Sequence, residues 1–195
     1  GLTWAGENQL ATVQDEKGTI FFFDLESETI TSKLKFAGKG DYEGITKRVN
    51  TYWVVRSDRR LFAVTEEGKV TEHNDFLDPS LEAEGITWLP QEDLLLIVCK
   101  KFQKRTSVLR YDKMGFAFDP NTDSLNPKPY LSIDVGEIQQ GRVFKDGEDR
   151  VQHFYAERKK VFAPSGVAQH PTLKNLFVIS SVGKKLAVLD ENQAL

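Results

Sequence analysis

Two glutamates of this 195-residue sequence stand in the same short phrase, each directly before a glycine. They are Glu43 and Glu84, and Gly-Ile-Thr follows both of them. If equal positions of a repeat point in equal directions, the two carboxylates converge, and each raises the pKa of the other unless a cation lies between them. Carboxylates, carbonyls and water are the ligands that Ca²⁺ prefers. The pair therefore predicts a hard-cation site, for Ca²⁺ above all, with Glu43 and Glu84 as metal ligands.

Asp41 and Ser165 are the other candidates to line this site. Asp41 lies two residues before Glu43, and Ser165 replaces the glutamate in the last copy of the phrase, while the first copy begins at its glycine. A full ring of carboxylates is thus impossible, and any cation site here is expected to be weak or partly hydrated. A structural interpretation stays open beside it, in which each glutamate only accepts hydrogen bonds from strand amides.

The phrase itself recurs along the chain and defines its organisation. Each copy leads into two short runs rich in Val, Ile, Phe and Tyr around a polar tip, which is typical of β-hairpins. A period of about 40 residues with three or four strands is that of a β-propeller blade. The sequence therefore predicts an all-β fold, with one β-propeller domain over residues 1–195 and the repeated glycines crowded around its central channel. These glycines are Gly1, Gly44, Gly85 and Gly166.

The repeat divides the chain into blades at residues 1–42, 43–83, 84–135 and 163–195. In the third blade we expect residues 94–99 to pair with a strand at 107–112, and residues 114–133 to form an outer hairpin. The doubled spacing before Gly166 leaves two alternatives for the chain up to residue 162. One is a degenerate blade, and the favoured one is an insertion, irregular over 137–160. The last blade ends one strand short, so the ring is expected to be incomplete in this chain.

Composition excludes some classes of function. With 26 basic and 29 acidic residues, the chain lacks the basic excess of a nucleic-acid-binding face. The basic run at residues 100–105 is interpreted as a solvated hairpin tip. No 18-residue apolar run occurs. The three histidines lack metal-ligand spacing, and no nucleophile-elbow or phosphate-loop motif is present.

Three side chains are expected to pack rather than react. Cys99 ends the apolar run at 94–99, so it is expected to be a buried, reduced thiol. Trp4 and Trp88 hold equal places in their repeats and are expected to pack between strands.

The repeated phrases resemble the SdiA-regulated domain family of bacterial extracytoplasmic β-propellers, which belongs with the NHL and phytase-like propellers. The resemblance rests on residues 40–46, 83–88 with 94–100, and 163–171 with 176–181. It implies five or six blades and a location in the periplasm, at the membrane or outside the cell. The chain departs from the family in lacking a serine before Gly1 and a final Glu-Gly-Ile blade. Because it opens on Gly1 without a methionine, we expect it to be processed or trimmed.

Two functions of different class follow. The first is a binding or scaffold propeller for a small-molecule or protein ligand, without nucleic acid and with a membrane link only through an anchor outside this chain. The second is a Ca²⁺-dependent hydrolase of a phosphate ester or lactone, by analogy with propellers that hold an axial metal. A purely structural role completes the set of alternatives.

Overall fold

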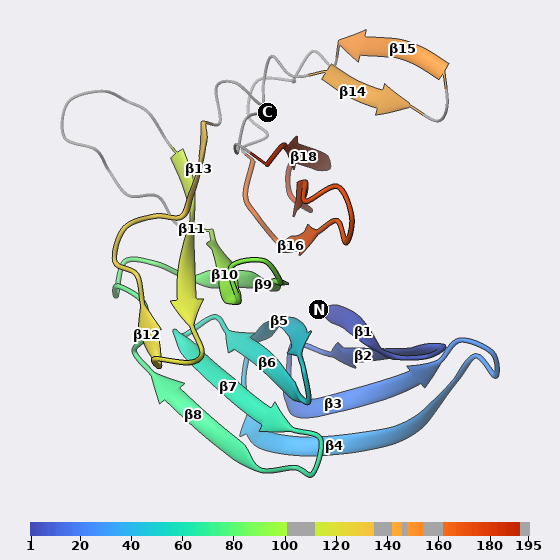
Figure 1. Cartoon of the computed structure of the whole chain (residues 1–195), viewed down its shortest axis with the longest axis vertical. Helices are drawn as coiled ribbons and strands as arrows, with labels where there is room; N and C mark the ends of the chain where they lie inside the picture. Colours follow the sequence, from blue (N-terminus) through green and yellow to red (C-terminus); the bar gives the residue numbers. More distant parts are fainter. Residues whose placement is uncertain (101–111, 135–141, 146–147, 154–161, 192–195) are drawn as a thin grey trace.

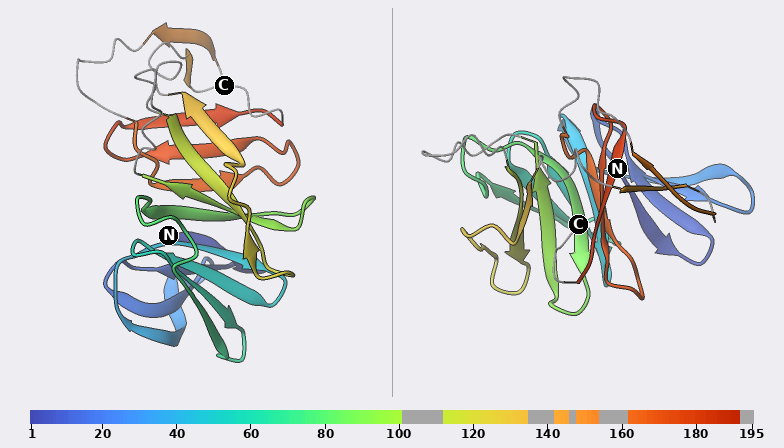
Figure 2. Two further views of the ribbon diagram at one scale, coloured as in Figure 1. Left: turned by 90° about the vertical axis from the view of Figure 1, so that its left-hand side faces the viewer. Right: turned by 90° about the horizontal axis from the view of Figure 1, so that it is seen from above.

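The computed structural model is all-β and describes residues 1–100, 112–134, 142–145, 148–153 and 162–191. Four antiparallel sheets follow one another around an arc as the blades of a β-propeller, which confirms the predicted fold class (Figures 1 and 2). The arc is open between its first blade and its last (Figure 1). Within the described residues no helix is long and apolar enough to cross a membrane.

The strands of each blade are ordered from the inside outward. Blade 1 contains β1 (Leu2–Gly6), β2 (Gln9–Val13), β3 (Lys17–Asp24) and β4 (Thr29–Lys39). Blade 2 contains β5 (Tyr42–Arg48), β6 (Thr51–Arg56), β7 (Arg60–Thr65) and β8 (Val70–Asn74). Blade 3 contains β9 (Ala83–Leu89), β10 (Leu94–Cys99), β11 (Asp112–Asp119), β12 (Ser124–Leu125) and β13 (Leu131–Asp134). Blade 4 contains β16 (Gly166–Gln169), β17 (Leu176–Ser180) and β18 (Lys185–Leu189).

Blade 3 differs from the expected strand pairing. The partner of β10 is β11, at Asp112–Asp119, and not a strand at residues 107–112. Residues 107–111 of that expected strand lie outside the described part of the chain. The other edge of β11 is shared by two short strands, β12 at one end and β13 at the other. The third strand therefore begins at Asp112, five residues later than the apolar pattern indicated.

The segment expected to be irregular contains a hairpin. Strands β14 (Arg142–Lys145) and β15 (Glu148–His153) pair antiparallel, so the prediction is wrong for these residues. The remainder of 137–160 lies outside the described residues. Blade 4 packs directly on blade 3, because the inner strands β9 and β16 meet at Gly85 and Gly166.

The glycines are explained by the crowding of inner strands. A Cβ on Gly44 would lie 3.0 Å from the Gly85 Cα atom, and one on Gly85 would lie 2.9 Å from the Gly166 Cα atom. Real side chains are not tolerated at such distances from backbone. The predicted role of these glycines is therefore confirmed, and their contacts set how closely successive blades approach the axis.

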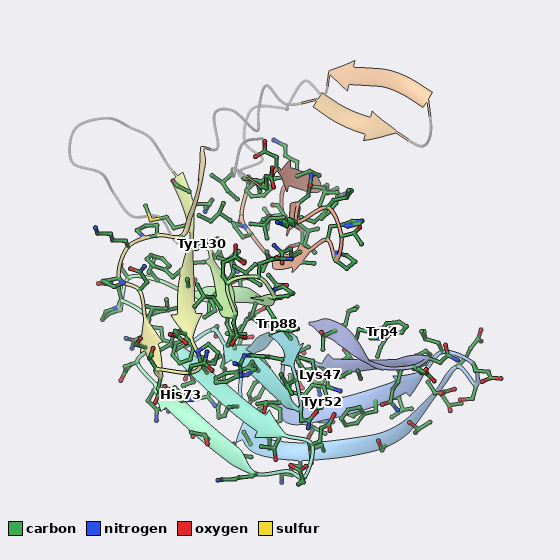
Figure 3. The ribbon with its side chains drawn as sticks, viewed as in Figure 1. Trp4, Lys47, Tyr52, His73, Trp88 and Tyr130 are labelled. Carbon is green, nitrogen blue, oxygen red and sulfur yellow. The ribbon has the colours of Figure 1, made fainter. Side chains whose placement is uncertain are left out.

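The core lies at the three junctions between successive blades. Each junction is a layer of apolar side chains from two facing sheets, as in a packed sandwich. Polar contacts at the rim reinforce it. Lys47 of β5 donates to the Ala5 carbonyl of blade 1 at 2.6 Å and lies over the Tyr52 ring (Figure 3). Arg48 forms a two-pronged pair with Asp93 of blade 3, at 2.7 and 2.6 Å.

The two equivalent tryptophans have different environments. Trp88 is half-buried, and its indole N–H donates to Asp93 at 3.2 Å. Trp4 is 57% exposed, so the expectation that it packs between strands is wrong. The reason is its place in blade 1, on the side of β1 that meets no other described blade (Figure 3).

Cys99 is fully buried and free, as the sequence predicts, and burial raises the pKa of its thiol to about 12. A neutral, inaccessible thiol is a poor nucleophile. At pH 8 the native protein should therefore leave an aromatic disulfide reagent unreacted, whereas the unfolded protein should consume one equivalent. Labelling of the native state as fast as that of the unfolded state would contradict this.

Candidate functional site

Glu43 and Glu84 occupy the same backbone feature in successive blades. In β5 the pairing passes from Tyr42 opposite Arg56 to Gly44 opposite Val55, so that Glu43 is an extra residue. In β9 it passes from Ala83 to Gly85 in the same way, and Glu84 is the extra residue. A β-bulge of this kind turns the side chain of the extra residue out of the regular alternation. The two glutamates therefore point in equivalent directions from their blades.

Glu84 is buried, at 5% exposure, and its neighbours are basic. The Lys100 ammonium donates to its Oε1 atom at 3.0 Å. Lys113, itself 1% exposed, donates to the Lys100 carbonyl at 2.5 Å, and the Glu84 charge opposes the fall in its pKa to about 8 that burial causes. Lys100 is therefore part of the site although its side chain is exposed, and the rest of the basic run at residues 100–105 lies outside the described part of the chain.

Glu43 has the most perturbed acidity of the group. Its pKa is raised to about 7, mainly by burial and then by the charges of Glu84 and Asp41, while Lys100 acts in the opposite direction. Burial also raises the pKa of Glu84, against the effect of the Lys100 hydrogen bond. Three carboxylates from two blades thus lie within electrostatic reach of one another and of one exposed lysine. We call Asp41, Glu43, Glu84 and Lys100 the charged cluster.

Asp41 and Ser165 are engaged differently. Asp41 is exposed, accepts a hydrogen bond from the Ser57 hydroxyl at 2.8 Å, and acts on Glu43 and Glu84 through its charge. The Ser165 hydroxyl accepts the Ser181 backbone N–H at 3.0 Å, within blade 4. Ser165 therefore bonds the backbone of its own blade, whereas Asp41 belongs to the charged cluster.

The Ca²⁺ site expected at Glu43 and Glu84 stays a prediction. Across the described residues, no group of three or more His, Cys, Asp and Glu side chains is placed to hold a metal ion. The nearest cation to Glu84 is the Lys100 ammonium, which already supplies the positive charge that two converging carboxylates require. A Ca²⁺ ion would have to displace it.

Sequence reasoning missed Lys100 and Lys113. A signal for Lys100 existed, since it lies two residues beyond Val98, as Ser57 lies two beyond Val55, and Ser57 also bonds an acid of the site. Lys113 gave no signal, because its strand was assigned to residues further back in the sequence.

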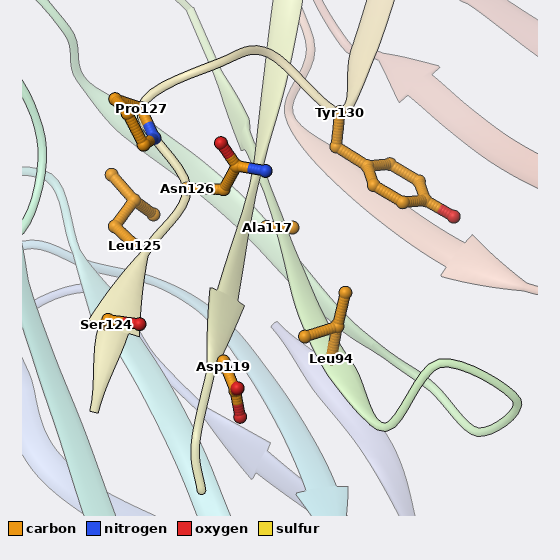
Figure 4. A pocket seen from close by; sticks show the side chains of 8 residues that line it. All are labelled: Leu94, Ala117, Asp119, Ser124, Leu125, Asn126, Pro127 and Tyr130. Carbon is orange, nitrogen blue, oxygen red and sulfur yellow. The ribbon is translucent and has the colours of Figure 1, made fainter. Parts of the chain in front are cut away.

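A separate hollow of about 430 Å³ lies in blade 3 (Figure 4). It forms beside Phe116 and Ala117 of β11, which pair with neither β12 nor β13, and Leu94, Ala117 and Leu125 give it an apolar wall. Its one carboxylate, Asp119, accepts the Asn121 backbone N–H at 2.8 Å and the Thr122 hydroxyl at 2.9 Å. Both hydrogen bonds lie within the turn that Asp119 begins, so the carboxylate of this hollow stabilises the turn.

Comparison with known proteins shows the fold alone. No family model matches the chain. No curated protein matches its sequence. Among solved structures, it is similar to Myxococcus xanthus glutaminyl cyclase, with 12% identity, a TM-score of 0.56, and coverage of 97% of this chain and 73% of that one. A Bacteroides caccae protein of unknown function matches with 9% identity, a TM-score of 0.53, and coverage of 96% and 56%.

Hydrazine synthase of Kuenenia stuttgartiensis is also similar, with 12% identity, a TM-score of 0.52, and coverage of 97% of this chain and 45% of that one. This chain therefore spans about half the length of the hydrazine synthase and Bacteroides chains. Their differing descriptions show that this arrangement of blades serves unrelated functions.

Proposed function

We propose that this chain is a binding propeller of the extracytoplasmic SdiA-regulated type, which holds a small-molecule or protein ligand through the charged cluster and performs no chemistry on it. One observation carries the proposal: Asp41, Glu43 and Glu84 act electrostatically on one another from two blades, and the Lys100, Lys113 and N-terminal ammonium groups lie within electrostatic reach of the two glutamates. The pKa of Glu43 is raised by burial and by the charges of Glu84 and Asp41, so a nearby cationic group would stabilise its carboxylate, which favours a ligand that presents such a group.

Binding is favoured over catalysis because the described cysteine and the histidines His73 and His170 lie outside the charged cluster. Cys99 is buried and neutral. His73 contacts Asp123 at 2.7 Å, and His170 accepts the backbone N–H groups of its own turn. The hydrolase is not proposed further, since it requires a metal where Lys100 stands. The extracytoplasmic location is supported by the phrases that this sequence has in common with the SdiA-regulated domain.

Ca²⁺ is a suitable probe of the charged cluster. Calorimetric titration should give weak binding to the wild-type chain, weaker binding to Glu43→Gln, and at least about tenfold tighter binding to Lys100→Met, because the competing ammonium is gone. Lys128→Met, which removes an equal charge from an exposed loop of blade 3, is the matched control.

Two outcomes would count against the cluster as a cation site. One is equal Ca²⁺ affinity of the Lys100 and Lys128 variants, and the other is the absence of binding heat in all of them. A melting curve of each variant without Ca²⁺ separates a loss of binding from a loss of fold.

A further inference from the structure

Blades 1 and 4 each present a sheet face that no other described blade covers. We call the face that a blade turns toward the next one its leading face, and the face toward the preceding one its trailing face. The trailing face of blade 1 and the leading face of blade 4 border the opening of the arc (Figure 1). Repeat equivalence shows what these two faces are built to contact.

The leading face is marked by the residue opposite the inner-strand glycine. Strand pairing and the Gly1–Val13 backbone bonds identify the four equivalents as Val13, Val55, Val98 and Ile179. The first three are buried in the junctions with the following blades. Ile179 is 50% exposed. Its cross-strand partner Leu186 is 54% exposed, whereas its equivalents Ile20 and Leu61 are fully buried.

The trailing face is marked by the residue after the glycine. The four equivalents are Leu2, Ile45, Ile86 and Val167. Ile45 and Ile86 are buried in the junctions with the preceding blades, and Val167 packs in the third junction. Leu2 is 68% exposed. Beside it, directly paired residues form an apolar row across all four strands of blade 1, namely Trp4, Leu10, Phe23 and Ile30.

The two open faces are therefore the two halves of one blade junction. Each of the three junctions inside the chain packs a leading face on a trailing face, and the same pair of faces is left over at the ends of the arc. Contiguous apolar faces of this kind mark association surfaces. A second copy of the chain carries the complement of each face.

We propose that copies of this chain associate head to tail, with the leading face of blade 4 packed on the trailing face of blade 1 of a second copy. Where two copies are related by a two-fold axis, the same contact forms twice and both open faces of each copy are covered. The inference stands on the blade faces and is independent of the charged cluster.

Sedimentation of the 195-residue chain tests this with Leu2→Asp and Leu186→Asp, which place a charge on one open face each at an exposed position. The wild type should be a dimer at about 100 µM, where a micromolar contact is saturated. Each variant alone should be a monomer, with the melting curve that the wild type has at a concentration low enough to dissociate the dimer. Val49→Asp is the matched control, since Val49 is 67% exposed on a turn of blade 2, away from both faces, and it should remain a dimer.

An equimolar mixture of the two variants gives the sharpest readout. Leu2→Asp keeps an unchanged leading face on blade 4, and Leu186→Asp keeps an unchanged trailing face on blade 1. These two faces can pack on each other, so the mixture should dimerise. A monomeric wild type at this concentration overturns the proposal. Failure of the mixture to associate, when each variant has abolished self-association, also overturns it, because an intact leading face and an intact trailing face then do not pack on each other.

Discussion

Gly85→Ala is expected to lower the free energy of unfolding by at least about 3 kcal/mol, at the upper end of what overpacked sites cost. The added methyl carbon would lie 2.9 Å from the Gly166 Cα atom and 3.1 Å from the Val167 nitrogen. Both atoms are backbone of blade 4, so no side chain can rotate away, and blades 3 and 4 must move apart. In a chain of this length such a loss lowers the melting temperature by about 10 °C, which calorimetry measures directly.

The control for this change is Gly38→Ala in β4. A Cβ at Gly38 meets nothing within 4 Å, and Gly38 has no left-handed conformation, so the same substitution should be close to neutral there. Equal melting temperatures for the two variants would mean that the inner strands can separate without cost. The glycines would then not set the spacing of the blades.

The fold followed from the sequence because its signal is repeated. Gly44 and Gly85 stand in nearly identical phrases, and each fixes where an inner strand passes its neighbour. Where the repeat is irregular, prediction failed. The strand after Cys99 was placed at residues 107–112 because apolar residues occur there, although its true partner, β11, begins at Asp112. Local propensity cannot determine the length of a turn when two segments compete for one strand edge.

The site could be predicted only in part, for a physical reason. That Glu43 and Glu84 share one direction follows from periodicity alone, but the charge that balances them does not. Lys100 comes from the end of β10 in one blade only, and Lys113 reaches the same place from β11. Neither lysine is repeated in the other blades. A prediction from the repeat pattern cannot find side chains that occur in one blade only.

The burial of Glu43, together with the charges of Glu84 and Asp41, also makes stability depend on pH. Glu43 has a pKa of about 7 in the folded chain, against 4.5 as its ordinary value. The folded state therefore binds more protons than the unfolded state between these values, and the free energy of unfolding falls as the pH rises from about 4.5 to 7. Above that range both states are ionised, and the penalty is constant. Below it both are protonated, and the penalty is absent.

Glu43→Gln should remove this dependence, because a neutral amide resembles the protonated acid at every pH. At pH 8 the variant is expected to be more stable than the wild type by about 1 kcal/mol, a value well below the full pKa shift because solvent screens this half-buried carboxylate. At pH 4 the two should be equal. Urea titrations from pH 4 to 8 measure the difference, and Glu7→Gln, at an exposed turn of blade 1, should show no such trend. A constant difference between Glu43→Gln and the wild type across this range would show that the Glu43 charge is already balanced in the folded chain, and that Lys100 neutralises both glutamates rather than Glu84 alone.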